Sequence, residues 1–261
     1  MKKIALIGIL IFSLGKNCFA HHAMEYIEME SYSTARKGEF VFHLHYDYMV
    51  DDKNDPNLDH WEFTPGLSYG ILDRLMFDFH THFAKFGPGH LVVNLNDPKY
   101  SKYSQNGPSP FMEAFALCLQ GRITEEKQLP VDVAVAFTYE QPFPRSEELL
   151  DGQKVYEGTL ILSRSFGVHS NVCLNVSFGK DGDETIKSLA LGIKTPISQD
   201  PHGIAAGVEF LVSDWKKLDE SWSILPGIYA SLAENIIFKT GIEFGKDANS
   251  MRANTTLMYG L

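Results

Sequence analysis

The feature that most constrains this chain is the alternation of apolar and polar residues at successive positions. From residue 40 to residue 48, every even-numbered position carries an aromatic residue or leucine, while most odd-numbered positions are polar. Successive side chains of a β-strand point to opposite faces, so this pattern predicts a strand with one apolar and one polar face. The same alternation recurs in 60–69 and 75–83. The chain is therefore expected to form a series of one-sided strands.

These segments are about ten residues long, the length that a tilted strand needs to cross a bilayer. Their apolar sets are rich in aromatic residues, which gather at the two membrane interfaces of barrels. In hydrocarbon every backbone N–H and C=O needs a protein partner, so a membrane sheet must close on itself. The predicted fold is all-β, a single transmembrane antiparallel up-and-down β-barrel of about 12 strands. The expected strands are 39–48, 60–69, 75–83, Phe111–Gln120, Val131–Glu140, Val155–Ser165, Val172–Phe178, Ser188–Thr195, Ile204–Val212, Trp222–Leu232, Ile236–Gly245 and Ala253–Leu261.

The connections between these strands alternate in length. The first, third and fifth are the longer segments Asp51–Asp59, Gly87–Pro110 and Gln141–Lys154. The second, Gly70–Asp73, is a tight turn, although the fourth, Gly121–Pro130, is longer than this alternation predicts. Long loops of such barrels are extracellular and short turns are periplasmic. An even number of strands then returns both termini to the periplasm.

The N-terminus has the pattern of a secretory signal peptide. Two lysines precede an uncharged, mostly apolar run that ends at Gly15, and the small residues Cys18 and Ala20 stand three positions and one position before a cleavage point after Ala20. This run is too short for a membrane helix. We therefore expect export through a cleavable signal peptide to the outer membrane of a Gram-negative bacterium. The predicted parts are a signal peptide at 1–20, a periplasmic leader or plug at 21–38, and the barrel at 39–261.

Charge and cysteine content restrict the partners. The formal net charge is −10 and the chain has no block of Lys and Arg, which argues against nucleic acid as a partner. Cys118 and Cys173 follow the signal peptide, and their positions in strand-like segments predict free thiols. The expected partners are outer-membrane lipid, the barrel-assembly machinery during biogenesis, and a small solute.

One hairpin resembles a known family. The segment Phe63–Leu75, with the sequence FTPGLSYGILDRL, is similar to a hairpin of outer-membrane transporters in the meta-pathway phenol-degradation-like family. A related Pro226-Gly227-Ile228 precedes a later turn, and His21-His22 resembles the start of some members after the signal. The resemblance implies a transport-like barrel with no catalytic residues.

The histidines of the polar faces are the sharpest candidate site. His43 and His45 share one face of the first strand, and His80 and His82 share the same face of the third. Neighbouring strands lie about 4.8 Å apart, so the two pairs are expected to be roughly 10 Å apart. Opposed imidazoles at that spacing could bind one Zn²⁺, with carboxylates orienting the rings. The wider set expected to line the lumen and contact solute is His43, His45, Asp47, His60, Glu62, Asp78, His80 and His82.

The remaining histidines offer one further candidate. Cleavage after Ala20 exposes an α-amine beside His21 and His22, a set of nitrogen ligands that suits Cu²⁺ or Ni²⁺. Two alternatives stay open: histidines that only hydrogen-bond within a hydrated pore, and an N-terminal pair that is an incidental polar tail. His90, by contrast, falls in a predicted loop and is expected to be solvated, as are His169 and His202.

The sequence is compatible with three functions. The first is a channel or transporter for a small solute, favouring cations because the predicted extracellular loops are acidic. The second is an outer-membrane hydrolase that modifies lipid, and the third is a structural barrel that transports nothing. A nucleophile needs a histidine within hydrogen-bond reach, but Thr81 faces away from His80 and His82. The expectation is therefore a barrel without catalytic residues.

Overall fold

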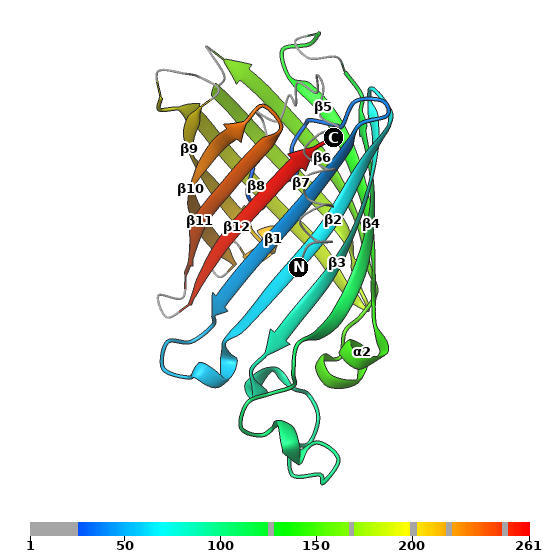
Figure 1. The fold of residues 1–261 in the computed structure, drawn as a ribbon, viewed down its shortest axis with the longest axis vertical. Helices are drawn as coiled ribbons and strands as arrows, with labels where there is room; N and C mark the ends of the chain where they lie inside the picture. The colour runs from blue at the N-terminus through cyan, green and yellow to red at the C-terminus, as the bar shows by residue number, and fades with distance from the viewer. Residues whose placement is uncertain (1–25, 125–127, 167–169, 199–202, 218–220, 247–249) are drawn as a thin grey trace, which may run out of the picture.

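The computed structural model describes residues 26–124, 128–166, 170–198, 203–217, 221–246 and 250–261. Within these ranges, twelve antiparallel strands each pair with the next along the chain, and the last pairs with the first to close a barrel (Figure 1). The predicted all-β barrel is confirmed. The strands are β1 (Phe40–Val50), β2 (His60–Leu72), β3 (Leu75–Phe86), β4 (Phe111–Arg122), β5 (Asp132–Pro142), β6 (Val155–Phe166), β7 (Ser170–Asp181), β8 (Glu184–Pro196), β9 (Ile204–Val212), β10 (Trp222–Ala233), β11 (Ile236–Gly245) and β12 (Met251–Gly260).

The alternating residues of each strand point alternately to the outer surface and to the lumen of the barrel. Large apolar side chains are exposed around the whole outer wall, where a soluble protein would bury them. The side chains at the alternate positions of the same strands point inward, and they are mostly buried and largely polar. This is the arrangement that a bilayer outside and a wet lumen inside require. The outward set includes Phe42, Tyr46, Phe63, Leu67, Phe79, Leu119, Phe137, Leu160, Leu191, Val208, Ile228, Ile242 and Leu257.

Strand register fixes which lumenal side chains are neighbours. His43 of β1 lies opposite Gly66 of β2, and Gly66 lies opposite His80 of β3. On the other side of β1, the closing pair with β12 places Thr256 opposite His45. The lumenal histidines therefore meet residues from both β2 and β12.

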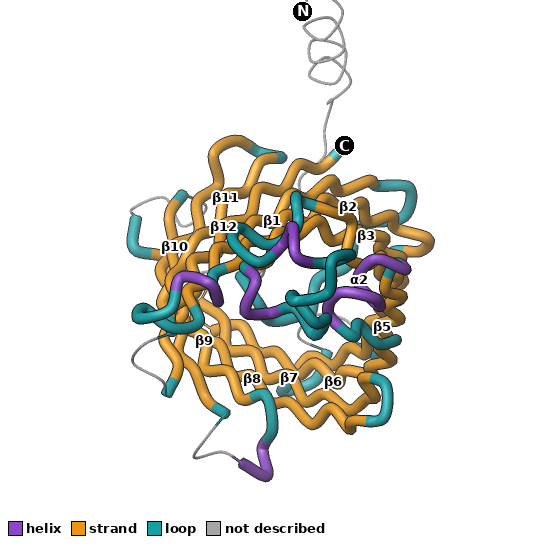
Figure 2. Tube along the Cα trace, turned by 90° about the horizontal axis from the view of Figure 1, so that it is seen from below, coloured by secondary structure: helices purple, strands orange, loops and turns teal. Residues whose placement is uncertain are grey.

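The long connections meet at one end of the barrel. They carry the 3₁₀ helices η2 (Pro56–Leu58), η3 (Pro88–His90) and η4 (Ser101–Tyr103) and the helix α2 (Pro144–Leu150). Seen along the barrel from that end, these loops and helices extend across part of the ring of strands (Figure 2). In the described part of the chain, no helix has the length and apolar character to cross a bilayer.

Backbone and side-chain contacts join these loops. The N–H of Gly87 donates to the Asp59 carbonyl at 3.0 Å, and the N–H of Val92 donates to the Leu149 carbonyl at 3.0 Å. Lys99 also forms an ion pair with Glu148, which raises the pKa of Lys99 and lowers the pKa of Glu148. The three long loops are therefore one connected assembly over the mouth.

Candidate functional site

The lumen is divided by the N-terminal segment 26–38, called the leader below. Two cavities of about 330 and 550 Å³ are lined in part by described residues of this leader. Carboxylates predominate among their charged lining residues, which are Glu28, Glu30, Asp47, Glu62, Asp78, Glu157, Glu243, Lys246 and Arg252. A lumen with this balance attracts cations.

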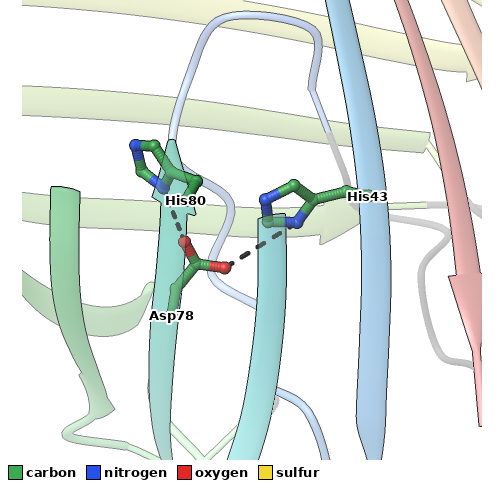
Figure 3. Close-up of side chains that lie close together, drawn as sticks. All are labelled: His43, Asp78 and His80. Atoms are coloured by element: carbon green, nitrogen blue, oxygen red, sulfur yellow. Dashed lines mark hydrogen bonds and ion pairs between the residues drawn. The ribbon is translucent and has the colours of Figure 1, made fainter. Parts of the chain in front are cut away.

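The smaller cavity contains the first of three histidine–carboxylate clusters. Asp78 accepts from Ser68 Oγ at 2.5 Å, and its Oδ1 lies 2.8 Å from His80 Nδ1. Its second oxygen lies 3.7 Å from Nδ1 of His43, so the carboxylate stands between the two rings (Figure 3). The ring centres of His43 and His80 are 6.2 Å apart. This is closer than the strand spacing alone predicts, because Gly66 between them has no side chain.

His45 belongs to a different cluster. Its Nδ1 lies 2.6 Å from Thr256 Oγ1, and its Nε2 lies 2.9 Å from Asp47 Oδ2. Arg252 also donates to Asp47 at 2.6 Å and lies 3.2 Å from the Glu28 carboxylate. A guanidinium already occupies the space between these carboxylates. This hydroxyl–imidazole–carboxylate chain faces the lumen, away from the lipid on which an outer-membrane lipid hydrolase acts.

The third cluster lies at the mouth. Asp51 Oδ2 is 3.7 Å from Nδ1 of His60 and 3.3 Å from Nε2 of His90. His90 also lies 2.5 Å from the Leu58 carbonyl and packs against the ring of Phe86. The expectation that His90 is solvated is wrong, because the joined long loops fold its ring against Phe86 at the end of the barrel wall.

The other predicted lumenal residues lie between these clusters. His82 Nδ1 is 3.3 Å from Thr64 Oγ1, and its Nε2 is 3.7 Å from Glu140. Glu62 is half-buried and lines the smaller cavity. The structure thus pairs His43 with His80 through Asp78 and places His82 beside His80. His45 lies in the separate cluster with Asp47. His21, His22, His169 and His202 lie outside the described residues.

The leader is held in the lumen through its backbone. The N–H groups of Ile27, Glu28 and Met29 donate to the carboxylate of Glu209 at 2.6, 3.0 and 3.0 Å. Lys239 donates to the Tyr26 carbonyl. A fully buried carboxylate with three backbone N–H donors is a specific clamp, because burying that charge without such partners is costly.

Further contacts fix the rest of the leader to the walls. Gln120 of β4 donates to the Ser31 and Ser33 carbonyls at 2.8 and 2.9 Å, and Asn175 of β7 donates to the Glu30 carbonyl at 3.0 Å. Wall glycines make room for leader side chains. A Cβ on Gly192 would lie 2.4 Å from the Tyr26 ring. The leader therefore fits a shaped path through the barrel.

Sequence reasoning did not find these leader contacts, nor the roles of Thr256, Arg252 and Glu209. The available signal for Thr256 and Arg252 was barrel closure, which brings β12 beside β1. For Glu209, the available signal was a carboxylate at an inward-facing position of a strand that is otherwise mostly apolar. Cys118 and Cys173 are not joined in a disulfide, as expected, and both are buried.

Comparison with known proteins supports the fold and leaves the family open. No family model and no curated protein matches the chain. The solved structure of KdgM porin aligns with a TM-score of 0.53 at 8% identity, over 84% of this chain and 98% of that chain. KdgM porin in complex with disordered oligogalacturonate aligns with the same score at 7% identity and with the same coverage. The P. putida toluene transporter TodX aligns with a TM-score of 0.46 at 10% identity, over 87% of this chain and 90% of that chain. The likeness to KdgM shows the fold of an outer-membrane barrel; the resemblance to the phenol-degradation-like family stays a prediction.

Proposed function

We propose that this protein is an outer-membrane channel for a small cationic solute, with the leader acting as a plug that narrows the lumen. The observation that carries the proposal is a series of acidic and imidazole-bearing side chains along the wall formed by β1, β2 and β3. It begins with Asp51 at the mouth, continues through Asp47 and His45, and reaches His43 and Asp78 beside the leader. Several moderate sites in series suit conduction, because an ion must both bind and leave.

The basic side chains of the described lumen support this preference for cations. Arg252 faces Asp47, Glu28 and Glu243. Lys239 contacts the leader carbonyl of Tyr26, and Lys194 lies over the rings of Tyr26 and Tyr229. These three cations are engaged with carboxylates or with the leader, and carboxylates still outnumber basic side chains among the residues that line the two cavities.

The test is the ion selectivity of the purified full chain in planar bilayers under a KCl gradient. We expect steady conductance and a reversal potential on the cation side. Glu62→Gln, on the wall of the smaller cavity, should shift the reversal potential toward zero, since it removes one lumenal charge. Glu234→Gln, exposed in the turn between β10 and β11 and away from the acidic mouth, is the matched control and should change little.

Two results would contradict this function. Anion selectivity would show that the acidic wall does not control permeation. No conductance from protein shown to be folded and inserted would favour a closed structural barrel or a lumenal enzyme over a channel.

A further inference from the structure

We infer that His43, Asp78 and His80 bind one late first-row divalent metal ion, such as Zn²⁺ or Cu²⁺, on the lumenal wall. This inference deepens the proposed function by naming the class of cation. The inference that this metal ion is the transported solute rests on the proposed channel function. The inference that the three residues bind the ion does not depend on that function.

The three ligand atoms already lie near one another. One nitrogen from each ring and one carboxylate oxygen fall within 4.8 Å of one another. In a tetrahedral zinc site with bonds of about 2.0–2.1 Å, neighbouring ligand atoms are about 3.3 Å apart. Oδ1 of Asp78 lies 2.8 Å from Nδ1 of His80, and Oδ2 of Asp78 lies 3.7 Å from Nδ1 of His43, so the two distances lie on either side of that value. Small side-chain rotations are enough to bring the atoms to one ion.

The surroundings hold the ligands and leave space for the ion. The hydroxyl of Ser68 donates to Asp78 and orients its carboxylate, the kind of support from an outer group that metal ligands commonly have. The missing side chain at Gly66 accommodates the His43 ring, whose Nε2 would lie 1.7 Å from a Cβ there. The cavity of about 330 Å³ that all three ligands line provides room for water on the open side of the ion.

The ligand chemistry selects the class of metal. Imidazole suits zinc, copper and nickel, whereas calcium and magnesium prefer a set made only of oxygens. The same cavity is lined by the sulfur-bearing side chains of Met76, Cys118 and Met258, which also suit softer ions.

The other clusters are weaker candidates for physical reasons. The cluster of Glu28, His45 and Asp47 already contains the guanidinium of Arg252, which a second cation would have to displace. In the cluster at the mouth, His90 Nε2 is within hydrogen-bond distance of the Leu58 carbonyl, so that nitrogen is engaged. Asp78 instead contacts Ser68, His80 and His43, none of which carries a permanent positive charge. This favours the His43–Asp78–His80 cluster.

The test is calorimetric titration of the folded full chain in detergent micelles with ZnCl₂, and separately with CuCl₂, CaCl₂ and MgCl₂. We expect one saturable Zn²⁺ or Cu²⁺ site and no competition from Ca²⁺ or Mg²⁺. The double variant His43→Ala with His80→Ala should weaken binding by at least about 100-fold, since two of three ligands are lost. His82→Ala is the matched control, because His82 lies on the same strand as His80 and lines the same cavity. The affinity of this variant for Zn²⁺ should stay within about threefold of wild type.

Folding of each variant is checked by far-UV circular dichroism and by heat-modifiable gel migration. No saturable binding in the folded wild-type protein overturns the inference, as does unchanged affinity in the folded double variant. An equal loss in His82→Ala also overturns it, because the site would then be a wider histidine group. Conductance separates the two proposals: a conducting protein that binds no metal refutes only the metal site, and a metal-binding protein that does not conduct refutes only the channel.

Discussion

At the scale of single residues, Gly66 determines where the His43 ring lies. A Cβ at this position would meet Nε2 of His43 at 1.7 Å, and that atom is at the end of a movable side chain. The glycine therefore does not relieve backbone strain, and its effect is to allow one ring position. The close approach of His43 to Asp78 depends on that position.

Replacement of this glycine separates binding from stability. Gly66→Ala should weaken Zn²⁺ binding by roughly 10- to 100-fold, because the His43 ring must move away from Asp78. The free energy of unfolding should change by no more than about 1 kcal/mol, since the displaced atom belongs to a side chain. Calorimetry and urea titration of the folded protein measure the two quantities. Gly158→Ala, where the nearest atom is 3.9 Å from the new Cβ, should leave zinc affinity unchanged. Unaltered zinc binding in Gly66→Ala would show that His43 is not a ligand.

The residue scale also shows where sequence reasoning was incomplete. Alternation predicted that His43, His45, His80 and His82 lie on the lumenal face, and their spacing suggested one four-histidine group. The structure divides that group because β12 brings Thr256 and Arg252 to His45 and Asp47. Their contacts depend on how the barrel closes, and register across the closing strands is not encoded in any local pattern.

At the scale of elements, the leader and the strands differ in how they could be predicted. Ile204–Val212 and Ile236–Gly245 were expected from alternation and are found with those bounds. Strand alternation reflects side-chain burial, which the sequence displays directly. The leader is instead held by side chains buried against the walls and by its backbone N–H and C=O groups, which every residue type except proline carries in full. A polar segment without periodicity therefore gave no indication of its path through the lumen.

The clamp on the leader can be tested at Glu209. Glu209→Ala leaves the N–H groups of Ile27, Glu28 and Met29 without their acceptor, which costs about 1–3 kcal/mol. Exchange of these amide hydrogens should accelerate roughly 5- to 150-fold, the ratio that corresponds to that energy. Single-channel conductance should rise if the leader acts as a plug.

Glu140→Ala provides the matched control for this experiment. Glu140 is also a lumenal glutamate, but it lies near His82 instead of the leader backbone. Amide exchange in residues 27–29 should not change in this variant. Equal exchange rates in Glu209→Ala and the wild type would refute the clamp.

At the scale of the whole molecule, the outer surface must match the bilayer along its full height. Leu160 lies near the middle of β6, pairs with Val135 and Val176 on the neighbouring strands, and is 40% exposed. Arg164 is exposed on the same face, near the end of the strand. A native arginine at that level is tolerated because long basic side chains can extend to the interface. The cost of charge on this face should therefore depend on depth.

This depth dependence gives a direct test of membrane insertion. Leu160→Arg should lower the free energy of unfolding in lipid vesicles by about 2–4 kcal/mol, whereas Phe166→Arg, at the end of the same strand, should cost only about 0–1 kcal/mol. Both residues are apolar and exposed on the wild-type surface, so the pair differs mainly in position along the barrel. Reversible guanidinium titration in vesicles, followed by tryptophan fluorescence, measures both values. Similar costs at the two positions would mean that the apolar belt is not centred on the middle of β6, and the expected placement of the barrel in the bilayer would have to be revised.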